Sequence, residues 1–177
     1  MKSHFHITLA DVEASELMRA AKLIGAKCTT IDLHKDARSQ RDRMLTKYQK
    51  DDSLDLMREC VSQLESAGFK VLRYKLERMY PDFKSLFDEV LTKESYGEIH
   101  IKTDASAPEV ETGFFQLSSN AEEVNHRFYN ARIYCKEDKF TFLLSYIKLL
   151  ENNVPILGCH IEKTVYDSKY SFDSWWA

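Results

Sequence analysis

The sequence predicts an α/β (α+β) protein built from two tandem βαββαβ units, each with an antiparallel sheet. Three observations predict this class: segments with period-two alternation, segments with apolar residues at helical spacing, and a restart of the same order of elements near residue 97. The order within each unit is the ferredoxin-like one, so we expect two such lobes related by a pseudo-twofold axis. The expected organisation is a first lobe at 1–80, a connecting helix at 81–96, a second lobe at 97–165 and an aromatic tail at 166–177.

In the first half, helices are delimited by capping residues and strands by alternation. Asp11 and Ser53 are expected N-caps, and Gly25 and Gly68 are expected to end the two helices. The predicted elements are a strand at 4–9, a helix at 11–24, strands at 27–33 and 43–49, a helix at 53–67 and a strand at 69–78.

The second half repeats this order after a predicted connecting helix. The stretch from His100 to Gly113 is shorter than the stretch from His6 to Gly25, so the first helix of this half is expected to be shortened or lost. The predicted elements are a helix at 82–93, strands at 96–103, 114–119 and 127–134, a helix at 137–151 and a strand at 156–164.

Composition limits the surroundings and partners of the chain. The formal charge of −3 over 177 residues gives no general attraction to nucleic acid or to an anionic membrane. No apolar run approaches the roughly 20 residues of a membrane span, so no membrane association is expected. The four cysteines lie far apart and form no C-x-x-C pair, which predicts free thiols and a cytoplasmic location.

Polar residues recur at matching places in the two halves. Alternation places His6 and Thr8 on one face of the first strand, and His100 and Lys102 on one face of its counterpart. If these faces meet, one cleft is surrounded by His6, Thr8, Glu77, His100, Lys102, His160 and Glu162. Such faces of an antiparallel sheet are also often exposed to solvent, and that alternative stays open.

The segment HFHIT at residues 4–8 resembles the H-x-T motif of the 2H phosphoesterase superfamily, whose members also consist of duplicated lobes. The second motif differs, because His100 is followed by Ile101 and Lys102. The resemblance implies a phosphodiesterase, a hydrolase without a cofactor, in which two histidines act as general acid and base on a cyclic or oligonucleotide phosphodiester. The catalytic residues under this hypothesis are His6, Thr8, His100 and Lys102, with His4, Lys75 and His160 binding a small nucleotide or RNA-like substrate.

An alternative hypothesis is a metal site. One His and one Glu from each half, namely His6, Glu77, His100 and Glu162, resemble the ligand plan of the vicinal oxygen chelate (glyoxalase-like) superfamily. That resemblance implies a divalent transition metal with open coordination positions, which polarises a substrate oxygen.

A third hypothesis is a binding or adaptor protein without catalysis. Trp175 and Trp176 in the tail could dock on the protein itself or on a protein partner. The overall pattern also resembles a group of uncharacterised bacterial and phage proteins, through Phe5 to Thr8, Glu98 to His100, Val165 to Ser168, and Asp173 with Trp175. This resemblance implies a layout and no particular activity.

Overall fold

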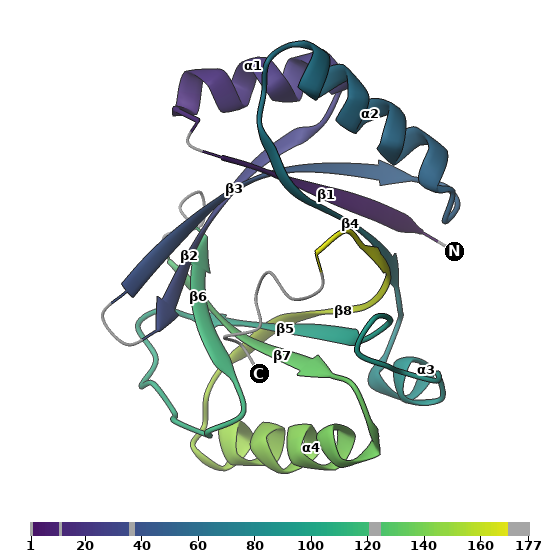
Figure 1. Ribbon diagram of the computed structural model, residues 1–177. Coiled ribbons are helices and arrows are strands. Elements are labelled where there is room, and N and C mark those ends of the chain that lie inside the picture. Colours follow the sequence, from purple (N-terminus) through teal and green to yellow (C-terminus); the bar gives the residue numbers. More distant parts are fainter. Residues whose placement is uncertain (1, 11, 36–37, 121–124, 170–177) are drawn as a thin grey trace.

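Eight strands of the chain close into one antiparallel barrel (Figure 1). The computed structural model describes residues 2–10, 12–35, 38–120 and 125–169. The strands are β1 (Ser3–Leu9), β2 (Lys27–Lys35), β3 (Arg38–Gln49), β4 (Val71–Met79), β5 (Gly97–Asp104), β6 (Gln116–Asn120), β7 (His126–Ile133) and β8 (Ile156–Asp167). Their order around the barrel is β1-β3-β2-β6-β7-β5-β8-β4.

Each half of the chain contributes one half of the barrel wall. The first half has the order β4-β1-β3-β2, and the second half has the matching order β8-β5-β7-β6. The halves join where β2 pairs with β6 and where β4 pairs with β8, both antiparallel. The α+β class expected from the sequence is confirmed, but the strands form one closed barrel where the sequence predicts two separate antiparallel sheets.

The helices lie outside the barrel (Figure 1). Within the described residues they are α1 (Ala14–Ile24), α2 (Leu54–Ser66), α3 (Phe83–Phe87) and α4 (Lys136–Glu151). α1 and α2 cover the first half, and α4 covers the second. Ser53 caps α2 by accepting the N–H of Asp55 at 3.2 Å, and Gly25 ends α1 with a φ of 64° that favours glycine.

Two hydrophobic cores lie between these helices and the outer face of the barrel. In the first, Phe5 and Ile7 of β1 are fully buried with side chains of α1 and α2. In the second, Ile99 and Ile101 of β5 are fully buried with side chains of α3 and α4. Because strand side chains alternate between faces, the residues between these apolar ones point into the barrel. The lumen is therefore polar.

Several predicted boundaries are wrong. The connecting helix expected at 82–93 is shorter and consists only of α3, and Val90 beyond its end is 79% exposed and adds nothing to the core. β3 begins at Arg38, earlier than the predicted residue 43. α1 begins after Glu13, whose N–H is accepted by Glu16 at 3.2 Å, whereas the expected cap Asp11 lies outside the described residues. The described residues between β5 and β6 contain no helix, as the shortened spacing predicts.

The end of the second lobe also differs from the prediction. Tyr166 and Asp167 belong to β8 and pair with β4, so the barrel extends into the predicted tail. Trp175 and Trp176 lie outside the described residues. The four cysteines form no disulfide, as expected. Among the described helices, none has the length and apolar character needed to cross a membrane.

Candidate active site in the barrel lumen

The lumen encloses a cavity of about 300 Å³ to which all eight strands contribute side chains. Eight-stranded barrels have an interior that side chains fill or that holds one small ligand. The ionisable or histidine side chains that line the cavity are His4, His6, Asp42, Tyr48, Arg73, Lys75, Glu77, Glu98, His100, Arg132, His160 and Glu162. The other lining residues are Thr29, Ile31, Met44, Thr46, Met79, Ser118, Ser119, Asn120, Phe128 and Asn130.

The two central histidines occupy matching positions in the strand register. His6 is the register partner of Thr46 on β3 and of Lys75 on β4. His100 is the register partner of Asn130 on β7 and of His160 on β8. In the barrel wall, β4 and β8 lie between the strands that carry the two histidines.

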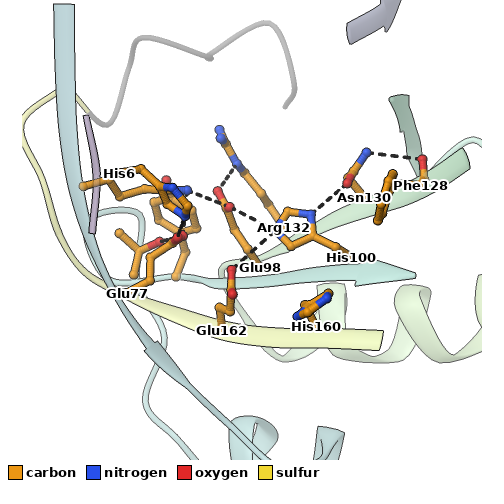
Figure 2. A network of polar contacts seen from close by, with 12 residues as sticks. His6, Glu77, Glu98, His100, Phe128, Asn130, Arg132, His160 and Glu162 are labelled. Atoms are coloured by element: carbon orange, nitrogen blue, oxygen red, sulfur yellow. Dashed lines mark hydrogen bonds and ion pairs between the residues drawn. The ribbon is translucent and has the colours of Figure 1, made fainter. Parts of the chain in front are cut away.

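Each histidine is anchored through Nδ1 by its register partner. His6 Nδ1 lies 2.9 Å from Thr46 Oγ1, and His100 Nδ1 lies 2.7 Å from Asn130 Oδ1. Figure 2 shows the His100 ring between Asn130 on one side and the carboxylates on the other. On each ring the Nε2 atom therefore faces the buried carboxylates.

The positions two residues before His6 and His100, and their partners on the neighbouring strands, carry different residues in the two halves. His4 pairs with Glu77 across β1 and β4, and Glu98 pairs with Glu162 across β5 and β8. All four side chains are at most 5% exposed. The matching wall positions therefore hold one carboxylate in the first half and two in the second.

Lys75 connects the two halves electrostatically. Its Nζ lies 2.6 Å from Glu77 Oε1 and 2.7 Å from Glu98 Oε2. Arg132 donates from Nε to Glu98 Oε1 at 2.9 Å (Figure 2). Burial alone favours neutral carboxyls, but the charge of Lys75 holds the pKa of Glu77 well below its usual range. Lys75 followed by Arg132 does the same for the pKa of Glu98.

The environments of the two histidines shift their pKa values in opposite directions. Burial lowers the pKa of His6, although Glu77 Oε2 lies 3.0 Å from its Nε2. Burial also opposes the protonation of His100, but Glu162 and Glu98, each 3.6 Å from its Nε2, outweigh burial and raise the pKa to about 10. His100 is consequently an imidazolium at neutral pH.

A third histidine lies against the same carboxylates. His4 Nε2 is 3.4 Å from Glu77 Oε2 and 3.4 Å from Glu162 Oε1. Burial opposes its protonation, but the hydrogen bond to Glu77 and the charge of Glu162 raise its pKa. Within the described chain, His4, His6 and Glu77 form a group whose ligand atoms all lie within 4.8 Å of one another.

The structure brings most of the sequence-predicted site residues to one cavity. His6 and His100, the proposed binding residues His4, Lys75 and His160, and the carboxylates Glu77 and Glu162 all line it. Thr8 and Lys102 do not: Thr8 is buried further along β1, and Lys102 is half-buried on β5.

Residues that the sequence did not single out complete the cavity wall. Asn130, Arg132 and Thr46 hold the histidines and Glu98 in place. Alternation along their strands is the only pattern in the sequence that places these residues on the inner face, and no recognisable motif accompanies it. Glu98 lies two residues before His100, so alternation gives both side chains the same face, but no sequence motif assigns Glu98 a role.

Comparisons with known proteins give little further information. No protein-family model matches the chain. No curated protein matches it. Among solved structures, the chain is similar to the ligand-free regulatory subunit of aspartate kinase from Thermus thermophilus, with 12% sequence identity, a TM-score of 0.30, and coverage of 83% of this chain and 91% of that one. A similarity at this level carries no argument about function.

Proposed function

We propose that the barrel lumen is the active site of a phosphodiesterase in which His6 is the general base and His100 the general acid. The observation that carries the proposal is the equivalent placement of the two rings. Each lies at the same register position in its half, each is held at Nδ1 by a side chain of the adjacent strand, and both line one cavity. The matching strand orders support a duplicated ferredoxin-like unit as the origin of this arrangement.

His100 is suited to the role of general acid. Its Nε2 proton is held between Glu98 and Glu162, so it is present throughout the neutral range. The alkoxide that leaves a phosphodiester is more basic than an imidazole, so transfer of this proton to the leaving oxygen is favourable. To close the cycle, His6 releases to solvent the proton that it takes from the attacking water, and His100 regains a proton from solvent.

His6 is placed to accept a proton from the attacking water. Thr46 fixes Nδ1, which leaves Nε2 to take the proton. Glu77 Oε2, 3.0 Å from this nitrogen, stabilises the imidazolium that forms. A positioned acid and base each contribute about 10²- to 10⁴-fold to such a reaction.

The rest of the lumen fits a small substrate with an anionic group. Arg73, Lys75 and Arg132 supply positive charge, and Ser118 and Asn120 supply hydrogen-bonding groups on another part of the wall. Because the wall is closed, a substrate has to enter through an end of the barrel. A cavity of about 300 Å³ favours a cyclic mononucleotide over an oligonucleotide.

The test is hydrolysis of a 2′,3′-cyclic nucleotide by chelator-treated protein. We expect turnover without added metal, and a loss of about 100-fold or more in kcat for His6→Ala and for His100→Ala. Circular dichroism of both variants checks that they fold. Full activity in either folded variant rejects the acid and base pairing.

A further inference from the structure

We propose that His4, His6 and Glu77 form a binding site for a divalent transition-metal ion of the zinc class, and that its occupancy switches off the acid–base chemistry of the lumen. The second part rests on the function proposed above, because the ion takes the Nε2 atom that His6 uses as a base. The first part stands on geometry alone.

The distances from Glu77 Oε2 to the two imidazole nitrogens match the edge of a coordination polyhedron. Bonds of about 2.0–2.1 Å in a tetrahedral site place neighbouring ligand atoms roughly 3.3 Å apart. Glu77 Oε2 lies 3.0 Å from His6 Nε2 and 3.4 Å from His4 Nε2. All three ligand atoms lie within 4.8 Å of one another, so one ion can contact them with small side-chain adjustments.

The carboxylate ligand atom lacks a hydrogen bond of regular geometry in spite of its burial. Glu77 is 0% exposed and His4 is 3% exposed. Glu77 Oε2 makes no hydrogen bond of regular geometry, although two imidazole nitrogens face it. Buried polar atoms are nearly always satisfied, and an ion between these three atoms would supply Glu77 Oε2 with its missing partner.

Neighbouring side chains already hold the ligands in orientation. Thr46 fixes the His6 ring through Nδ1, which presents Nε2 to Glu77. Lys75 and Thr164 contact Oε1 of Glu77 at 2.6 and 3.4 Å, which leaves Oε2 as the ligand atom. Such outer partners are typical of metal sites built from histidine and carboxylate. Two histidines and one carboxylate also leave coordination positions for water.

This group of metal ligands differs from the four ligands expected from the sequence. His4 joins His6 and Glu77, whereas His100 and Glu162 contact each other at 3.6 Å on the other part of the wall. The pairing of His4 with Glu77 across β1 and β4 explains the difference, because it places both imidazoles of β1 beside one carboxylate.

The test is a titration of chelator-treated protein with Co²⁺, followed by visible absorption. We expect one Co²⁺ per chain with the intense bands of a low-coordinate site, and about a 100-fold loss of affinity in His4→Gln and in Glu77→Gln. His160→Gln is the matched control, since His160 lines the same cavity outside the three-atom group. We expect it to bind Co²⁺ like the parent protein.

Absence of Co²⁺ binding, or equal binding by the parent protein and a folded His4→Gln variant, overturns the site. For the switch, Zn²⁺ at saturation is expected to lower cyclic-nucleotide hydrolysis at least about tenfold, reversibly with chelator. Stimulation by Zn²⁺ overturns the switch. If Co²⁺ binds as expected but the protein hydrolyses no phosphodiester at any metal content, the site stands and the proposed function falls.

Discussion

His100 Nδ1 lies 2.7 Å from Oδ1 of Asn130, its register partner on the neighbouring strand. The amide nitrogen of Asn130 donates to the carbonyl of Gln116 at 2.8 Å and to Ser118 Oγ at 2.9 Å, which fixes the orientation of the amide. Because the oxygen of Asn130 can only accept, His100 donates from Nδ1. The ring is thereby held with Nε2 toward the carboxylates of the lumen.

The first prediction concerns Asn130 as a positioning residue. In Asn130→Leu the ring of His100 loses its acceptor, so we expect kcat for a cyclic phosphodiester to fall about 10- to 100-fold with a smaller change in KM. Asn130→Asp keeps an oxygen acceptor and should recover part of kcat. Steady-state kinetics of both variants at equal folded fraction checks this. Equal kcat in the two variants contradicts a role in orienting His100.

The second prediction concerns the pH dependence of stability. The folded-state pKa of His100, about 10, lies above that of an unfolded histidine, so its contribution is complete below the unfolded pKa and disappears as pH rises through the folded one. Glu98 and Glu162 face the ring, and His160 is its partner on β8. We expect the free energy of unfolding to fall by about 2–4 kcal/mol between pH 7 and 10.

Urea unfolding of the parent protein and of His100→Gln across this range measures that contribution. The variant should show a shallower decline, although not a flat one, because the raised pKa of His4 acts in the same direction. An identical slope in the two proteins contradicts the assignment to His100.

Alternation alone could predict which side chains share a face of each strand. Residues two apart on a strand share a face, as His4 and His6, Lys75 and Glu77, and His160 and Glu162 do, and these side chains line one cavity. The period of two is a local property of a strand, so a single sequence carries it.

Closure of the barrel could not be predicted in the same way. It depends on pairing between β2 and β6 and between β4 and β8, which joins edges from different halves. Edge pairing uses backbone groups and leaves no pattern of side chains. The same limit explains Tyr166 and Asp167, which look like the start of a tail but pair with β4.

The sequence also could not predict how far along the barrel axis each side chain lies. Thr8 and Lys102 follow their histidines by two positions, so alternation gives them the same face. They do not line the cavity, and a register shift follows each of them. Position on a face therefore does not determine access to a ligand.

The third prediction concerns Lys75. In Lys75→Met the carboxylates of Glu77 and Glu98, at 2.6 and 2.7 Å from Nζ, lose their shared cation while buried. We expect a loss of about 3–5 kcal/mol in the free energy of unfolding. The double variant Lys75→Met/Glu98→Gln should recover part of it.

Denaturant unfolding of these variants checks the prediction, with the exposed Lys70→Met as the control. That surface change should alter stability by no more than about 0.5 kcal/mol. A Lys75→Met variant as stable as Lys70→Met contradicts the account of the network.

The fourth prediction concerns the seam where β8 joins β4. Arg73 donates from Nε to Asp167 Oδ1 at 2.9 Å and from a terminal nitrogen to Oδ2, and the hydroxyl of Tyr96 donates to Oδ2 at 3.0 Å. Arg73 holds the pKa of Asp167 below its usual range against the effect of burial. Asp167→Asn removes the carboxylate that accepts two hydrogen bonds from the buried guanidinium of Arg73, so we expect a loss of about 3–5 kcal/mol in the free energy of unfolding. A double-mutant cycle with Arg73→Met separates this pair from general strand pairing, because the second substitution removes the guanidinium itself. We expect the double variant to lose at least about 1 kcal/mol less in the free energy of unfolding than the two single variants lose together. If the losses are additive within about 0.5 kcal/mol, the pair does not hold the barrel closed.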